Sequence, residues 1–351
     1  MDKAPLTVAM IGVGMVAATH LRALRDARPA LSLAGICARR PQTAAAFADR
    51  AETELGYRPV IYADSAAVAA DPGIDIALIL TPPDARLALI APLARAGKAI
   101  LLEKPLARNA SEARAVVTLC EEMNIPLGVV FQHRVRAASQ HAAALVNAGD
   151  LGALGLVEMT VPWWRKQAYY DEPGRGTYAR DGGGVLISQA IHTIDLALSL
   201  TGPVTEVQAM TATTRFHEME AEDFATAGLR FENGAIGSLV ASTASFPGGA
   251  ETITLHFERA SLHLGEGVLT VHWRDGREET HGATAGTGGG ADPMAFTHEW
   301  HKGILEDFAA ALRDGHPPMI TGRQALESHL LIDAIALSAR EGRTVSCGEV
   351  A

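Results

Sequence analysis

Through the first third of the chain, short apolar runs alternate with longer stretches in which apolar positions recur at helical spacing. This rhythm is typical of βαβ units, which build a parallel sheet. The runs predict strands at residues 7–11, 31–37, 74–80, 99–102 and 125–131. Helices are expected up to residue 27 and at 43–55, 84–96 and 111–123. We therefore expect a doubly wound parallel sheet that is complete near residue 125.

From about residue 151 the chain becomes rich in β segments. These predict strands at residues 155–164, 205–213, 226–231, 235–242, 252–257 and 268–273. Asn233-Gly234 lies between two of them and Asp275-Gly276 follows another, and both pairs readily adopt the positive φ of hairpin turns. We therefore expect these strands to form a mostly antiparallel sheet. Helices are expected at 185–200 and 297–313, with a last one at 322–340.

Composition narrows the class of protein. The 351 residues are 48% hydrophobic and 20% charged, which fits a globular protein of two domains and excludes a disordered chain. The net charge of −10 and the lack of a basic cluster argue against nucleic acid as a partner. No apolar run approaches the length of a membrane span or has the flanks of a signal peptide. Three cysteines, Cys37, Cys120 and Cys347, lie far apart in the sequence, so we expect neither a disulfide framework nor a thiolate zinc site. This cysteine content fits a protein of the reducing cytoplasm.

The strongest local motif joins the first strand to the first helix. It reads Gly-x-Gly-x-x-Ala from Gly12 to Ala17. Gly12 permits a tight turn, Gly14 lets the backbone approach a pyrophosphate, and the small Ala17 allows helix and strand to pack closely. Because the helix N-terminus then faces the phosphates, Met15 and Val16 are expected beside them. The motif predicts dinucleotide binding, with a plain tight turn as the alternative.

The end of the second strand bears on which dinucleotide binds. An NAD site usually carries an Asp or Glu there for the ribose 2′-hydroxyl, but the chain reads Ala38-Arg39-Arg40. Two guanidinium groups suit a 2′-phosphate. We therefore expect these three residues to contact the cofactor and favour NADP, with NAD possible; solvated loop arginines are the alternative.

A lysine stands at the end of a later predicted strand, in Glu103-Lys104-Pro105. Open α/β sheets bind their ligands at this edge. A partly desolvated lysine has a lowered pKa, so it can exchange a proton with a substrate hydroxyl. An ordinary surface lysine is the alternative.

Together these motifs resemble the Gfo/Idh/MocA family, which includes glucose-fructose oxidoreductase and inositol dehydrogenase. The resemblance also rests on Thr81-Pro82 after a buried strand and on the triplet 182–184 followed by His192-x-x-Asp195. The motifs stand in the family's order, and the resemblance covers nearly the whole chain.

The resemblance implies an α/β fold with an N-terminal Rossmann domain at 1–125. A C-terminal α+β domain at 126–351 would follow, built on a large, mostly antiparallel open sheet, and the last helix would pack back on the first domain. The implied activity is NAD(P)-dependent oxidation or reduction of a sugar or cyclitol. Thr81, Pro82 and Glu103 would contact the cofactor and Lys104 the reacting hydroxyl, and Pro105 would follow a cis bond.

His192 becomes the acid/base partner of Lys104 through the same resemblance, because an imidazole can take and return a proton near neutral pH. Without the resemblance, His192 would be interpreted as a hydrogen-bonded histidine of the core. Asp195 is expected to have a structural role. Inositol-dehydrogenase-like members carry an Asp four residues before this histidine, where this chain has Ser188 and then Gln189. These two would bind substrate hydroxyls, with helix packing as the alternative. Arg86 stands where many members carry a histidine.

Further substrate contacts are expected from Trp163, Arg165, Tyr169 and Arg175, since aromatic faces pack on sugar C–H groups and arginine binds hydroxyls or carboxylates. A packing cluster is the alternative. The histidines of the run 298–301 are three apart and not four, so this run reads as an ordinary helix face and no metal site is predicted. The glycine-rich run 282–290 reads as a surface loop or, alternatively, a lid.

We therefore expect an NADP- or NAD-dependent oxidoreductase that acts on a secondary alcohol of a sugar, sugar acid or polyol. A redox-assisted glycosidase and a non-catalytic dinucleotide sensor are the alternatives. A homodimer or homotetramer is expected through the C-terminal sheet, because a wide apolar sheet rarely faces water.

Overall fold

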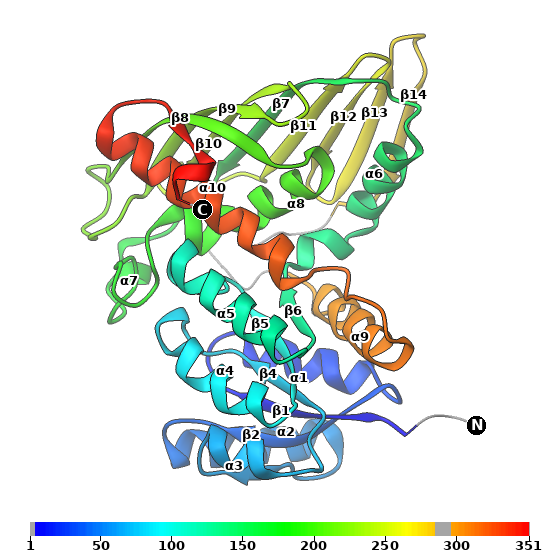
Figure 1. The fold of residues 1–351 in the computed structure, drawn as a ribbon, viewed down its shortest axis with the longest axis vertical. Helices are drawn as coiled ribbons and strands as arrows, with labels where there is room; N and C mark the ends of the chain where they lie inside the picture. The colour runs from blue at the N-terminus through cyan, green and yellow to red at the C-terminus, as the bar shows by residue number, and fades with distance from the viewer. Residues whose placement is uncertain (1–3, 285–295, 351) are drawn as a thin grey trace. The chain divides into compact units, whose positions relative to one another are not determined.

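The computed structural model describes residues 4–284 and 296–350. They form two compact units (Figure 1). Among the described residues, the first unit contains 4–107, 112–132 and 297–325, and the second contains 108–111, 133–284, 296 and 326–350. Among the helices of the described residues, none has the length and apolar character that a bilayer crossing requires.

The first unit is built on a six-stranded sheet in which every neighbouring pair is parallel. Its order is β3-β2-β1-β4-β5-β6. The strand order therefore reverses between β1 and β4, and doubly wound sheets bind nucleotides at such a switch point. The strands are β1 (Leu6–Ile11), β2 (Leu31–Cys37), β3 (Val60–Tyr62), β4 (Ile76–Ile79), β5 (Ala99–Glu103) and β6 (Leu127–Val130). All residues of β4, β5 and β6 are buried, as expected for strands covered on both faces.

Within the described part of the chain, five helices alternate with these strands, and one more joins the unit from much later in the sequence. They are α1 (Ala17–Asp26), α2 (Pro41–Leu55), α3 (Ser65–Ala70), α4 (Arg86–Arg95), α5 (Ala110–Glu122) and α9 (Glu299–Asp314). Local sequence explains their starts, since Pro41 occupies the first turn of α2 and the Asp64 side chain accepts the Ala67 N–H at the start of α3. α1 packs against α2 and α9, and α3 packs against α4.

The second unit is built on a nine-stranded sheet of order β14-β13-β12-β11-β7-β10-β9-β8-β15. Only the pair β7 and β10 is parallel among these described strands. The strands are β7 (Leu154–Pro162), β8 (Val204–Ala212), β9 (Phe224–Phe231), β10 (Ile236–Ser242), β11 (Thr252–Phe257), β12 (Ala260–Gly265), β13 (Val268–Trp273), β14 (Glu278–Gly282) and β15 (Val345–Ser346). The expected fold class, a parallel Rossmann sheet followed by a large, mostly antiparallel one, is confirmed.

One face of this second sheet carries the helices of the unit. α6 (Ala137–Ala148) packs against β12, β13 and β14, and α8 (Ile191–Thr201) packs against β7 and β11. α7 (Gln167–Tyr170) is a single turn. α10 (Gly322–Glu341) begins in the first unit and belongs to the second from Leu326 onward, where Ser338 Oγ accepts the Ala209 N–H of β8 at 3.0 Å.

The other face of the second sheet is open. Burial alternates along its strands, because successive side chains point to opposite faces. Among the outward side chains are Leu156, Met210, Ile236 and Val240, all more than a third exposed. Leu156 and Ile236 are cross-strand partners on the central strands β7 and β10. An apolar patch therefore lies at the middle of this open face.

Several elements differ from the sequence expectations. The pattern did not reveal β3, α3, α6, β12 or β14, because these are short or lack a clear apolar period. The expected helix at 185–200 begins with a π-helical turn, Leu186–Ala190, before α8. The expected domain boundary after residue 125 falls just before β6, whose backbone pairs with β5. Most of the glycine-rich run 282–290 lies outside the described residues.

Candidate active site

The loop between β1 and α1 has the geometry that a pyrophosphate needs. Gly12 has φ of +98°, and a Cβ there would lie 3.1 Å from Leu80 and Thr81 atoms, so only glycine fits. A Cβ on Gly14 would meet nothing within 4 Å, which leaves open space beside the loop. Met15 is 46% exposed, and the N-terminus of α1 has neither a side-chain cap nor an acidic residue in its first turn. These features fit a bound dinucleotide phosphate.

The residues expected at the ribose follow β2. Ala38 is half-buried, whereas Arg39 and Arg40 are exposed. Neither arginine pairs with a carboxylate within residues 4–284 and 296–350. Their guanidinium groups are therefore available to an anion from solvent.

The ends of β4 and β5 carry the remaining residues expected at the cofactor. Thr81 is half-buried and Pro82 exposed just after β4, and Lys104 is half-buried just after β5. The Lys104–Pro105 bond is cis, as the family resemblance implied. Since β4 and β5 are adjacent and parallel, both loops lie at the same edge of the sheet as the glycine loop after β1.

Glu103 is held by two histidines that sequence reasoning did not assign. Its Oε1 lies 2.8 Å from His20 Nε2 on α1 and 3.6 Å from His301 Nε2 on α9, and its Oε2 accepts the Lys104 N–H at 3.1 Å. The imidazole rings of His20 and His301 meet edge to face, with centroids 4.8 Å apart. All three side chains are buried. This network fixes the carboxylate directly beneath the turn that carries Lys104.

Protonation of this network is set by burial and hydrogen bonding together. Burial alone would raise the pKa of Glu103, but hydrogen bonds from His20 and His301 outweigh it and hold that pKa well below its usual range. Burial lowers the pKa of His301. Glu103 therefore stays ionised as an acceptor at neutral pH. Within the run 298–301, His301 is 1% exposed and lies on the side of α9 that faces Glu103.

In the second unit, the outer two glycines of the triplet, Gly182 and Gly184, pack against backbone that leaves no room for side chains. A Cβ on Gly182 would lie 2.3 Å from the Arg108 carbonyl oxygen. A Cβ on Gly184 would overlap the Glu222 carbonyl oxygen. The Glu222 carboxylate accepts the backbone N–H groups of Gly184 and Leu186 at 3.1 Å, at the start of the helical segment that leads to His192. Burial raises the pKa of Glu222, opposed by these hydrogen bonds.

His192 lies in the first turn of α8 and is 5% exposed. Its ring stacks on that of His133, with centroids 4.8 Å apart and an interplanar angle of 22°. His133 belongs to the 3₁₀ helix Gln132–Val135, directly after β6. Arg134 of the same turn makes a two-point ion pair with the fully buried Asp195. The turn after β6 therefore positions α8 through two contacts, and Asp195 has a structural partner.

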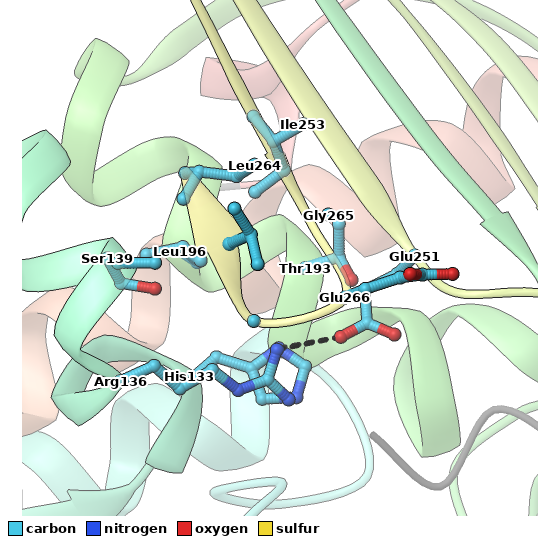
Figure 2. A pocket seen from close by; sticks show the side chains of 13 residues that line it. His133, Arg136, Ser139, Thr193, Leu196, Glu251, Ile253, Leu264, Gly265 and Glu266 are labelled. Atoms are coloured by element: carbon cyan, nitrogen blue, oxygen red, sulfur yellow. Dashed lines mark hydrogen bonds and ion pairs between the residues drawn. The ribbon is translucent and has the colours of Figure 1, made fainter. Parts of the chain in front are cut away.

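A small cavity lies beside this stack. It has a volume of about 20 Å³ and is lined by His133, Arg136, Thr193 and Glu251 among others (Figure 2). Arg136 Nη1 donates to Glu251 Oε1 at 2.8 Å, and both side chains are buried. A space of this size holds about one water molecule, so it is a structural feature and not a sugar site.

The residues expected to bind substrate fall into two groups. Ser188 Oγ donates to the Gly184 carbonyl at 2.5 Å, one helical turn earlier. The Gln189 side chain is 3% exposed, and both atoms of its amide lack a hydrogen-bond partner among the described residues. A buried, unsatisfied amide is costly, so a polar ligand that paired with it would recover free energy.

The second group is brought together by the structure. Arg165 lies 5.2 Å from the Trp163 ring and 5.9 Å from the Tyr169 ring. The Arg175 guanidinium lies 4.7 Å from the centroid of the same Tyr169 ring, and Arg175 Nη1 donates to the Tyr169 hydroxyl at 3.0 Å. Trp163 and Arg165 are buried, and Tyr169 and Arg175 are half-buried. These four side chains form one aromatic–guanidinium cluster.

Several residues of the site were missed in the sequence. His20, Arg86 and His301 reach Glu103 or its backbone from three separate helices, which no spacing rule connects. The run Gln132-His133-Arg134 carried a usable signal, since polar residues at the carboxyl end of a parallel strand mark a ligand-binding edge.

Comparison with known proteins gives two family matches. Residues 6–131 match the family model described as an oxidoreductase family with an NAD-binding Rossmann fold, and residues 139–263 match the GFO/IDH/MocA C-terminal domain. A D-apiose dehydrogenase of Paraburkholderia graminis is 29% identical over 96% of this chain and 88% of its own. The scyllo-inositol 2-dehydrogenase (NAD(+)) of Bacillus subtilis is 27% identical over 89% of this chain and 88% of its own.

Solved structures are similar over the whole chain as well. The WlbA dehydrogenase of Bordetella pertussis, in complex with NADH and UDP-GlcNAcA, is 28% identical with a TM-score of 0.81. The alignment covers 97% of this chain and 98% of that one.

Proposed function

The chain belongs to the Gfo/Idh/MocA family of oxidoreductases, and on this basis we propose that it moves a hydride between NAD(P) and a secondary alcohol or ketone of a sugar, sugar acid or cyclitol. The observation that carries the proposal is the Glu103–Lys104 turn, held by a buried His–Glu–His network at the sheet edge that also bears the glycine loop. The related dehydrogenases act on apiose and inositol, which supports the substrate class.

The first unit would hold the cofactor. Gly12, Gly14, Met15 and Val16 would take the pyrophosphate on backbone N–H groups at the open end of α1. Thr81, Pro82 and Glu103, together with Lys104, would flank its nicotinamide end at the loops after β4 and β5. The bound cofactor supplies the carbon that accepts or returns hydride.

Lys104 and His192 would manage the proton of the reacting hydroxyl. In the oxidising direction, the Lys104 amine binds the substrate oxygen, and the His192 imidazole takes the hydroxyl proton as the hydride leaves carbon. Reduction reverses both steps. His192 suits this task because the stack on His133 and the helix anchored by Arg134 and Asp195 restrict its ring.

Substrate contacts would come from the aromatic–guanidinium cluster of Trp163, Arg165, Tyr169 and Arg175 and from Ser188 and Gln189. The buried, unpaired amide of Gln189 supports its role as a hydroxyl partner. We favour a substrate with several hydroxyl groups, because guanidinium and amide groups of this kind bind hydroxyls.

NADP is the proposed cofactor over NAD. The exposed Arg39 and Arg40 and the absence of an acid from the segment Ala38–Arg40 support a 2′-phosphate. The related structure from Bordetella pertussis holds NADH, so the preference rests on these two arginines alone.

A second copy of the chain is the proposed partner for the open sheet face, giving a homodimer or a homotetramer. The apolar patch of Leu156, Met210, Ile236 and Val240 supports this, because water-exposed apolar patches usually mark interfaces. All three cysteines are free, which supports a reducing compartment such as the cytoplasm.

Absorbance at 340 nm tests the proposed function. The purified protein is incubated with NAD⁺ or NADP⁺ and a panel of aldoses, sugar acids and inositols. Steady formation of reduced cofactor with one class of polyol is expected, and it should be lost in Lys104→Ala. Sugar release from glycosides without net cofactor reduction would instead support a redox-assisted glycosidase. Cofactor binding without turnover of any polyol would support a sensor.

A further inference from the structure

Arg86 is a buried cation with an unusual set of partners. It is the first residue of α4 and is 2% exposed. Burial lowers its pKa to about 9, partly opposed by the charges of Glu103 and Asp84. A guanidinium is costly to bury, so its position calls for partners that use its donors.

Those partners are backbone carbonyls at the ends of two neighbouring strands. Nε and Nη2 donate to the Thr81 carbonyl at 3.1 and 2.8 Å. Nη1 donates to the Glu103 carbonyl, and Nη2 approaches the Lys104 carbonyl at 3.5 Å. A single planar group thus joins the loop after β4 to the loop after β5.

Both loops touch the residues that the proposed reaction uses. Thr81 lies against Gly12 of the glycine loop, since a Cβ on Gly12 would lie 3.1 Å from Thr81 atoms. The Lys104 carbonyl belongs to the proposed catalytic residue itself. The backbone of Lys104 is therefore fixed from two directions, by Arg86 at its carbonyl and by Glu103 Oε2 at its N–H.

We propose that Arg86 is a positioning residue for Lys104, which clamps the loops after β4 and β5 so that the lysine amine is held at the substrate oxygen. The expected loss of kcat rests on the proposed function, since it requires that Lys104 takes part in the reaction. An alkyl side chain could fill the same space without a desolvation penalty, but it could not bind three carbonyls at once. Displacing a catalytic group by about 1 Å can lower turnover by about 100-fold.

The kinetic test compares three variants: Arg86→Met, Arg86→Lys, and Arg95→Met as a control on the exposed end of the same helix. Arg86→Met should lower kcat about 100-fold, with substrate KM and the NADPH dissociation constant within threefold of wild type. Arg86→Lys, which can reach some of the carbonyls, should recover part of the loss. Arg95→Met should match wild type.

A kcat within threefold of wild type in folded Arg86→Met would overturn the proposal. So would a loss of cofactor affinity equal to the loss of kcat, since the clamp would then serve the cofactor and not the lysine. Should Arg86→Met fail to fold, Arg86→Gln, which cannot bind three carbonyls at once, decides by the same criteria.

A readout without turnover separates this inference from the proposed function. Lysines are methylated with ¹³C-formaldehyde, which keeps their charge, and the Lys104 resonance is assigned by its loss in Lys104→Arg. Its chemical shift reports the surroundings of the amine, so it should move in Arg86→Met, where the clamped carbonyls are released, and stay fixed in Arg95→Met. An unchanged chemical shift overturns the positioning role even if no substrate is found. A moved chemical shift with no turnover of any polyol would support the clamp and contradict the proposed reaction.

Discussion

Arg134 holds Asp195 by two hydrogen bonds, from Nε to Oδ2 at 2.7 Å and from Nη2 to Oδ1 at 2.6 Å. Asp195 is fully buried and lies one helical turn after His192. The pair therefore fixes the segment of α8 that carries the proposed acid/base residue.

Breaking this pair should destabilise the protein. Arg134→Met leaves the Asp195 carboxylate buried without its cation, which should lower the free energy of unfolding by about 3–5 kcal/mol. Urea unfolding followed by circular dichroism measures this. Arg134→Met combined with Asp195→Leu should regain most of the loss, and Arg230→Met, which breaks an exposed pair with Glu206, should change little. A loss no larger in Arg134→Met than in Arg230→Met would show that the buried pair contributes nothing.

Replacing Lys104 should affect chemistry more than binding. Lys104→Ala removes the proposed contact with the substrate oxygen, so kcat should fall by at least about 100-fold. The NADPH dissociation constant, measured by fluorescence titration, should stay within threefold, because the pyrophosphate is held by the glycine loop. Lys302→Ala on α9 serves as the matched control. Equal losses of turnover and of cofactor affinity would contradict a catalytic role.

Cofactor preference should depend on the two arginines after β2. Arg39→Ala combined with Arg40→Ala should raise the KM for NADP⁺ about 10- to 100-fold, the value of one or two charge-assisted hydrogen bonds. The KM for NAD⁺ should hardly change, since NAD⁺ lacks the 2′-phosphate. Arg22→Ala, on the exposed side of α1, is the control. Equal changes in the KM values for NADP⁺ and NAD⁺ would mean that these arginines do not bind the 2′-phosphate.

Acidification should destabilise the fold through the network around Glu103. The pKa of His301 is lowered from 6.5 by burial, so the unfolded chain binds a proton that the folded chain refuses. The free energy of unfolding should therefore fall as the pH drops below 6.5, by up to about 1.4 kcal/mol per pH unit. His301→Gln keeps a donor for Glu103 but cannot titrate, so it should lose less stability than wild type between pH 7.5 and 5.5. The exposed His316→Gln should behave as wild type, and an identical pH dependence in His301→Gln would refute the assignment.

The fold was largely predictable because its signals are local. The glycine motif, the buried strand β4 and the strands β11 and β13 each follow from a short apolar pattern with turn residues at its ends. Doubly wound topology then follows from the order of these elements.

The supporting side chains of the site were not predictable in the same way. His20, Arg86 and His301 lie far apart in the chain and meet only when α1, α4 and α9 pack on the first sheet. Burial also hid them, because a sequence pattern cannot distinguish a histidine on a helix face from one that bonds a carboxylate. The stack of His133 on His192 likewise arises from tertiary packing.

A double-mutant cycle on Lys104 and His192 tests most directly whether the two side chains act on one hydroxyl. The measurement is kcat for wild type, Lys104→Ala, His192→Ala and the double variant, with reduced cofactor followed at 340 nm. Groups that act as a unit are strongly non-additive, so the double variant should be little slower than the slower single variant. Losses that simply multiply would contradict a shared reacting group.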